Sequence, residues 1–295
     1  MVHAGVAGLN AMTDAAMLTS ALLGSVVGLI LALTGAGGAI VAVPLLVFGL
    51  GLEVARAAPI GLLAVGLSAG VGALLALREG HVRYKAAALM AATGSVVSPL
   101  GLWVAHQVPD APLTLAFACV LALVAWRMLR AARGASGHDN DGAAHRQTRL
   151  PCRLDLARGK LDWTAPCARA LALSGAGAGF LSGLLGVGGG FVIVPALRRA
   201  SDIPMQQIVA TSLAVIALVS TTGVVASAAS GHMLWIAALP FAAGALVGML
   251  GGRGLARHVS GARLQQAFAL FAGFVALGMA AKAVHALLAT GVAPH

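Results

Sequence analysis

The chain reads Thr34-Gly-Ala-Gly-Gly-Ala-Ile-Val-Ala-Val-Pro44 and, 151 residues later, Leu185-Gly-Val-Gly-Gly-Gly-Phe-Val-Ile-Val-Pro195. Each stretch lies within a long apolar region. Glycines this closely spaced predict an interrupted helix, because each costs about 1 kcal/mol relative to alanine in a helix interior. Pro44 and Pro195 predict a kink in the short segment that follows each interruption. The fold is therefore expected to contain two broken helices at equivalent positions.

The two stretches belong to a longer internal duplication. A shift of 151 residues aligns the two halves almost without gaps, with a one-residue slip around 82–86. The aligned pairs are Val43-Pro44 with Val194-Pro195, Gly72 with Gly223, Gly80-His81 with Gly231-His232, and Ala87-Ala88-Leu89 with Ala237-Ala238-Leu239. An ordered series of matches indicates a repeat, which is a common plan among secondary transporters.

The composition excludes a soluble protein. Hydrophobic residues make up 59% of the 295 residues and charged residues only 9%, whereas a soluble domain carries roughly 25% charged residues. Lipid must therefore be the solvent for most of the surface. The net charge of +10 does not indicate a nucleic-acid partner, because aromatic residues are only 4% and the Lys and Arg lie in loops between apolar runs. Basic residues placed in this way orient a membrane protein.

The apolar runs predict an all-α polytopic membrane protein with about four full transmembrane helices and one short broken helix in each half. Eight runs reach the roughly 17–20 residues that a membrane-spanning helix needs. The runs are 15–34, 38–52, 57–77, 86–105, 111–131, 167–185, 189–200, 205–230, 234–252 and 264–290, of which 38–52 and 189–200 are the short ones. We expect a first transmembrane repeat at 15–131, a polar cytoplasmic linker at 132–166 and a second repeat at 167–290.

The distribution of basic residues predicts that the two repeats are inverted. If each repeat contributes five crossings and the N-terminus lies outside, all Lys and Arg except Arg56 and Lys282, 17 of the 19, lie on the cytoplasmic side. If the short segments re-enter the same face, the best orientation leaves six basic residues outside. Lys and Arg favour the cytoplasmic side, so the count favours inverted repeats of five segments, although re-entrant hairpins stay an alternative.

The glycine stretches are the best candidates for a binding site. A broken helix in hydrocarbon is tolerated only where protein or water satisfies its backbone groups, and a glycine turn that opens a short helix presents free N–H groups and a positive dipole end to an anion. The candidate substrate-binding residues are Thr34, Gly35, Gly37, Gly38, Gly186, Gly188, Gly189, Gly190, Thr211 and Ser212. The alternative is that these glycines only allow close helix packing. A dinucleotide-binding turn is excluded because no strand precedes the glycines.

The doubled motif resembles the sulfite exporter TauE/SafE family over about 20–131 and 170–285. The pattern Gly-x-Gly-Gly-x₅-Pro at Gly35–Pro44 and Gly186–Pro195 carries the resemblance, together with Ala210-Thr211-Ser212-Leu213. The first half departs from the family there and reads Pro59-Ile60-Gly61-Leu62. The resemblance implies a secondary transporter for a small sulfur-containing anion, such as sulfite or a sulfonate, in the cytoplasmic membrane of a prokaryote.

Functions other than that of a secondary transporter explain fewer features of the sequence. A passive anion channel could use the same glycine breaks, as could a transporter of a different small organic anion. A membrane enzyme would need paired carboxylates, histidine ligands within helices or reactive cysteines, and the sequence offers none in a fitting pattern. Cys152, Cys167 and His145 match no zinc spacing, so neither a metal nor another cofactor is expected. The expected partners are the bilayer and the anion, and a homo-oligomer is compatible with the sequence.

Overall fold

The computed structural model describes residues 2–34, 38–134, 152, 154–155, 160–161, 164–231, 233–256 and 261–291. Two of the candidate residues, Gly35 and Gly37, lie outside these ranges. The helices are α1 (Val2–Thr34), α2 (Ala39–Gly49), α3 (Val54–Arg78), α4 (Tyr84–Gln107), α5 (Asp110–Gly134), α7 (Ala165–Leu185), α8 (Gly190–Ala200), α9 (Met205–Ala229), α10 (Trp235–Ala256) and α11 (Gly261–Gly291). A two-stranded antiparallel ribbon pairs β1 (Leu154–Asp155) with β2 (Lys160–Leu161).

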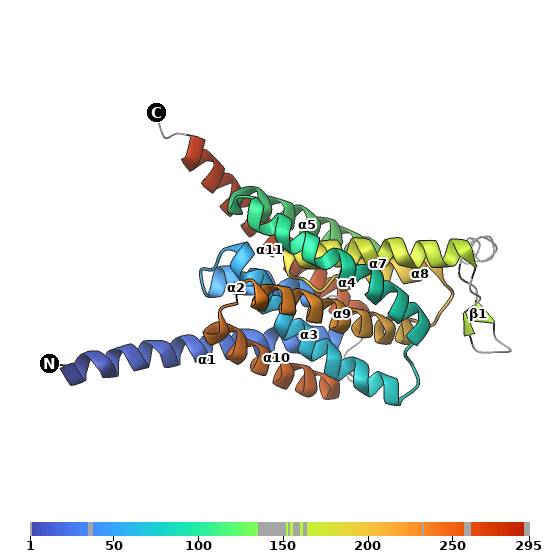
Figure 1. The fold of residues 1–295 in the computed structure, drawn as a ribbon, viewed down its shortest axis with the longest axis horizontal. Coiled ribbons are helices and arrows are strands. Elements are labelled where there is room, and N and C mark those ends of the chain that lie inside the picture. The colour runs from blue at the N-terminus through green and yellow to red at the C-terminus, as the bar shows by residue number, and fades with distance from the viewer. Residues whose placement is uncertain are drawn as a thin grey trace.

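The structure confirms the predicted fold class of an all-α polytopic membrane protein. In the described part of the chain, eight helices are long and apolar enough to cross a membrane. The helices α2 and α8 have 11 residues each, so each extends about 16 Å, roughly half the thickness of the hydrocarbon core. Figure 1 shows both chain ends at the left of the molecule and β1 at the opposite end.

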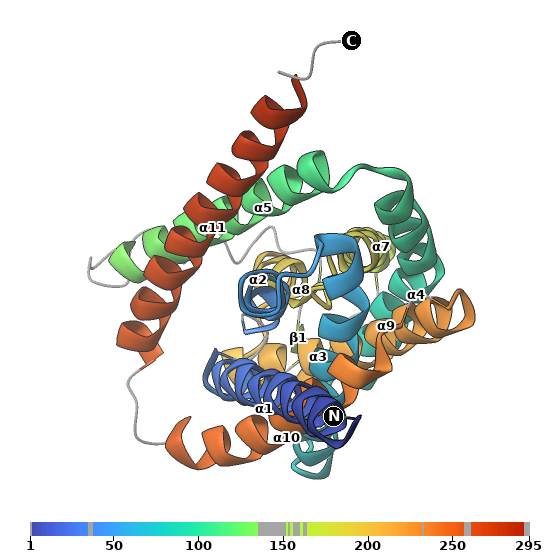
Figure 2. The ribbon, with the colours of Figure 1, turned by 90° about the vertical axis from the view of Figure 1, so that its left-hand side faces the viewer.

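Helices from the two halves of the sequence pack against each other. The most extensive contacts join α1 to α10 and α4 to α7, and α3 packs on α9 as α5 packs on α11. The shift that aligns the halves pairs α1 with α7 and α4 with α10, so the first two contacts are equivalent. Each half therefore contributes a helix to a pair that the other half completes (Figure 2).

Small residues allow these two helix pairs to approach closely. A side chain at Gly24 or Gly28 of α1 would collide with the α10 backbone, and one at Gly175 or Gly179 of α7 would collide with the α4 backbone. The residues of each pair are four apart, as in the small-xxx-small pattern of transmembrane helix interfaces. The equivalent crossings therefore use equivalent glycines, since Gly24 and Gly28 align with Gly175 and Gly179.

The two short helices occupy the interior. Figure 2 shows α2 and α8 surrounded by the longer helices, and the two contact each other. The helix α2 also contacts α1, α3 and α11, whereas α8 contacts α7 and α9. Eight of the eleven residues of α2 are buried. The N-terminal ends of both short helices therefore lie within the helical bundle.

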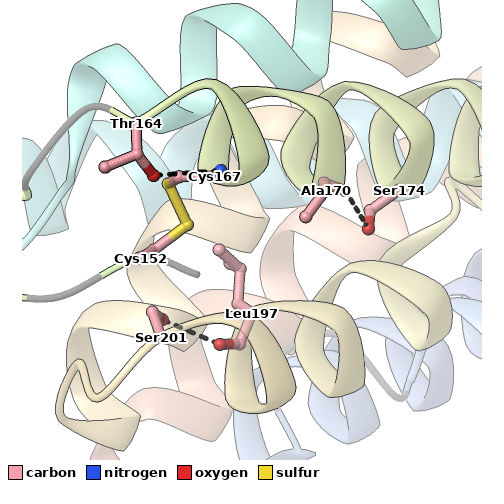
Figure 3. Close-up of a disulfide and its surroundings, with 7 residues drawn as sticks. All are labelled: Cys152, Thr164, Cys167, Ala170, Ser174, Leu197 and Ser201. Atoms are coloured by element: carbon pink, nitrogen blue, oxygen red, sulfur yellow. Dashed lines mark hydrogen bonds between the residues drawn. A yellow bond between two sulfur atoms is a disulfide. The ribbon is translucent and has the colours of Figure 1, made fainter. Parts of the chain in front are cut away.

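A disulfide ties the segment between the halves to the helical bundle. Cys152 and Cys167 are joined, and their side chains lie beside the end of α8 (Figure 3). The Cys152 backbone N–H donates to the Ala200 carbonyl at 2.9 Å, and Thr164 caps α7 by accepting from the Cys167 N–H. Both cysteines are buried. Packing against α8 therefore removes the Cys152 side chain from solvent.

Candidate functional site

The second glycine break has a backbone conformation that favours glycine. Gly186, Gly188 and Gly189 have φ angles of 70°, 70° and 68°, in the left-handed region that other residues rarely adopt. At the C-terminal end of α7, the Gly186 N–H donates to the Ser182 carbonyl at 2.8 Å. The N–H groups of Val192 and Ile193 then donate to the Gly189 carbonyl as α8 begins.

The break leaves polar hydrogens inside the protein. Among the described backbone hydrogen bonds outside the helices, none uses the N–H groups of Gly188 and Gly189. Residues 186–190 are all buried, and an unpaired backbone group buried away from water is costly. These N–H groups at the start of α8 therefore suit an acceptor, and the positive end of the helix dipole favours an anionic one.

Helices from both halves enclose the second break. A side chain at Gly186 would collide with Ala58 of α3, and one at Gly188 would lie 2.9 Å from Ile216 Cγ2 of α9 and 3.1 Å from Val65 Cγ1 of α3. These neighbours are themselves buried, so the second break lies among closely packed helices.

The first break differs from the second in its described residues. Gly38 has φ −61° and ψ −26°, whereas its aligned counterpart Gly189 is left-handed. Thr34 donates its hydroxyl to the Ile30 carbonyl at 2.7 Å, and a side chain at Gly38 would collide with the α1 backbone around Leu31. The duplicated sequence therefore has two different local backbones.

The hydroxyls predicted at the start of α9 have protein partners. Thr211 Oγ1 accepts from the Arg83 backbone N–H at 3.1 Å, and Ser212 Oγ donates to the Val209 carbonyl at 2.8 Å. Both residues are buried. Their contact with a substrate stays a prediction, and it would require the exchange of these bonds.

Ser220 is a candidate that the sequence did not single out. Its hydroxyl is buried and has no hydrogen-bond partner within the described part of the chain. It lies 3.4 Å from the position that a Cβ on Gly188 would occupy. Other hydroxyls of α9 and its C-terminal end, those of Thr221, Thr222, Ser227 and Ser230, donate to nearby backbone carbonyls. Only the packing of α9 against α8 and α3 distinguishes Ser220 from them.

Charged side chains are absent from the buried part of the described structure. The buried polar residues there are all serine or threonine. In the described structure, the hydroxyls of Ser98, Ser182 and Ser220, which lie at or near the break, have no hydrogen-bond partner. A substrate at the second break would therefore meet dipoles rather than a full positive charge.

A cavity of about 520 Å³ lies elsewhere, where the ends of α3, α4 and α5 meet. Its lining includes Glu53, Arg56, His106 and Asp110 from the ends of α3, α4 and α5. The lining mixes both signs of charge, and none of its described residues belongs to a glycine break. The cavity therefore does not coincide with the predicted site at the second break.

The matched part of the chain includes both breaks and the long helices around them. The sulfite exporter TauE/SafE family matches residues 20–279. The chain belongs to the TauE/SafE family. TauE/SafE membership, together with the eight apolar helices, makes the chain a multi-pass membrane transporter.

Individual relatives of this chain are also named as probable membrane transporters. A probable membrane transporter protein of Xylella fastidiosa (strain Temecula1 / ATCC 700964) is 31% identical over 260 residues, which cover 86% of this chain and 91% of the relative. Bacillus subtilis (strain 168) has a probable membrane transporter protein, YunE, that is 46% identical over 70 residues, covering 24% of this chain and 26% of YunE. No solved structure matches the chain at a significant level.

Proposed function

We propose that this TauE/SafE protein is a secondary transporter that moves a small sulfur-containing anion, such as sulfite or a sulfonate, across the cytoplasmic membrane of a prokaryote. The substrate binds at the glycine breaks, near the middle of the bilayer. The observation that carries this proposal is the buried start of α8, where the Gly188 and Gly189 N–H groups have no described backbone partner. An anion supplies the acceptor that these groups lack.

The arrangement of the helices supports a carrier with inverted repeats. In both equivalent contacts, α1 with α10 and α7 with α4, a helix of one half packs on a helix of the other half. The termini lie at the end of the molecule opposite the linker strands (Figure 1). In this proposal the N-terminus is outside and the linker is cytoplasmic. Alternating access then consists of a movement of one set of helices relative to the other around the breaks.

Uptake into proteoliposomes tests the proposed transport activity. The purified full chain is reconstituted, and the uptake of sulfite and methanesulfonate is measured against liposomes without protein. A carrier gives uptake that saturates with substrate concentration, whereas a channel gives a flux that rises linearly and carries current. Absence of protein-dependent uptake for every sulfur-containing anion tested would contradict the proposed function.

A further inference from the structure

We propose that the second break alone holds the substrate, and that with Ser220 it forms a site for an oxyanion carrying a single negative charge. This inference rests on the proposed function and specifies which break binds and what charge it accepts. Two observations lead to it: the position of the unpartnered Ser220 hydroxyl and the absence of buried charged side chains around it in the described structure.

The two breaks are unequal in the groups they offer. At the second break, the Ser220 hydroxyl lies 3.4 Å from the Cβ position of Gly188. The aligned residue on α3 is Ala69, which has no polar group and is fully buried. Gly189 is left-handed where Gly38 is helical. At these two aligned pairs of described residues, both the backbone and the side chain therefore distinguish the second break from the first.

A second unpartnered hydroxyl, which belongs to α4, lies against the same face of α9 as Ser220. Gly223 is three residues further on α9 and so lies on the same helix face. The Cβ position of Gly223 is 3.5 Å from Ser98 Oγ of α4. Ser98 is also buried and without a partner. A buried hydroxyl that lacks a partner lowers stability, so two such groups along one face of α9 indicate a polar ligand that the folded protein accommodates there.

The charge preference follows from the electrostatics of a buried site. The cost of transferring an ion from water to a medium of low dielectric rises with the square of its charge. The start of α8 supplies roughly half an elementary positive charge, and the hydroxyls and N–H groups add only dipoles. These groups compensate one negative charge far better than two. The site therefore selects hydrogensulfite or a sulfonate over sulfate or doubly charged sulfite.

No titratable side chain contacts the second break in the described structure. The helices that enclose it carry their ionisable groups near the helix ends. These groups are Arg56 and Arg78 on α3, Tyr84, Lys85 and His106 on α4, Arg169 on α7, and Arg198 and Arg199 on α8, while α2 and α9 carry none. The pH dependence of binding should therefore follow the ionisation of the substrate.

Transport in proteoliposomes tests the charge preference with three anions, measured at equal pH on both sides. Methanesulfonate carries one charge throughout the range, sulfate carries two, and sulfite passes from one to two near neutral pH. We expect sulfate to compete with methanesulfonate at least tenfold more weakly than unlabelled methanesulfonate does. Sulfite uptake should fall several-fold from pH 6 to pH 8, while methanesulfonate uptake stays constant. Equal competition by sulfate, or sulfite uptake that rises with pH, would overturn the inference without affecting the proposed function.

The variant Ser220→Ala tests the position of the site. Loss of one hydrogen bond to a charged ligand should raise the half-saturating methanesulfonate concentration about tenfold. Without ligand, the variant should unfold at the same or a higher temperature, because it removes a buried hydroxyl that had no partner. The matched control is Ser227→Ala on the same helix, since Ser227 is buried but donates to the Gly223 carbonyl at 2.9 Å. Unchanged half-saturation in Ser220→Ala would place the substrate elsewhere and overturn the inference.

Discussion

Gly177 and Gly179 lie two residues apart on α7 and have opposite surroundings. A Cβ on Gly179 would collide with the Gly94 backbone of α4, whereas one on Gly177 would meet no atom within 4 Å. Gly179 is buried and Gly177 is exposed. The same residue type therefore serves a helix crossing at one position and faces outward at the other.

This difference predicts the effect of leucine at the two positions. Gly179→Leu should destabilise the protein by about 1–3 kcal/mol, the usual cost of overpacking, because the backbones of α4 and α7 would have to separate. Gly177→Leu places the same side chain outside the crossing and should have little effect. Thermal unfolding of both purified variants in detergent measures this. Equal unfolding temperatures for the two variants would contradict the predicted crossing.

Gly188 is a less suitable position for testing the binding site. With φ at 70° and neighbours 2.9 Å and 3.1 Å from its Cβ position, a leucine there would strain the backbone and displace Ile216 and Val65. We expect Gly188→Leu to abolish transport, but to lower the unfolding temperature as well. Ser220→Ala should impair neither folding nor membrane insertion. Comparison of the two variants therefore distinguishes damage to the fold from loss of a contact with the ligand. Normal flux in Gly188→Leu would contradict a binding role for this break.

The elements show how far the sequence determines the fold. Apolar length and the glycine stretches predicted every described helix, because these features are local. Gly186 at the end of α7 and Gly190 at the start of α8 coincide with the predicted interruption. The partnership of α1 with α10 depends on contacts between distant segments, which the lengths and periodicities of single helices do not specify.

The binding candidates show the same division. Clustered glycines predicted the break at Gly186–Gly190, since their conformational cost is a local property. The different roles of Ser212 and Ser220 depend on which helix face meets α8. Both are buried serines of α9, yet Ser212 has a backbone partner and Ser220 has none. Packing between helices decides this difference.

The disulfide adds a constraint at the far end of α8. Cys152 and Cys167 close a loop with a sequence separation of 15, and a loop of this size is stabilised by about 3 kcal/mol through the restricted unfolded state. Reduction of the purified wild-type protein should therefore lower its unfolding temperature. The paired variant Cys152→Ser with Cys167→Ser should show the lower value already and not respond to reductant.

Cys119 provides the control for that experiment. It is free and exposed, so Cys119→Ser should keep the wild-type response to reductant. A thiol-reactive reagent should modify one cysteine in the oxidised wild-type protein and three after reduction and unfolding, as the chain has three cysteines. An unchanged unfolding temperature on reduction would contradict a stabilising role for the disulfide.

At the scale of the whole molecule, the proposed topology predicts which loops face the cytoplasm. Glu53 lies between α2 and α3, and Asp202 lies between α8 and α9; both are exposed. Single cysteines are introduced at these positions in a protein that carries Cys119→Ser, Cys152→Ser and Cys167→Ser, and are treated in cells with a membrane-impermeant maleimide. We expect Glu53→Cys to react from outside, and Asp202→Cys to react only after the membrane is opened. Labelling of Asp202→Cys only from outside would refute the inverted arrangement of five segments.

The topology also predicts the chemical state of Cys152 and Cys167 in the cell. Both lie beside the end of α8 (Figure 3), at the face that the basic residues assign to the cytoplasm. Disulfides persist mainly in oxidising compartments. Labelling that places Asp202 in the cytoplasm would predict that the two thiols are reduced in the cell and form the disulfide on oxidation.

The exchange of helices between the halves has a consequence for biogenesis. During translation, α1 leaves the ribosome long before α10, and α4 before α7. The glycine face of α1 therefore lacks its packing partner, α10, until most of the polypeptide has been synthesised. A truncated nascent chain that ends before α10 should be a good substrate for membrane quality-control proteases. The two halves produced as separate polypeptides should rescue each other when they are synthesised together.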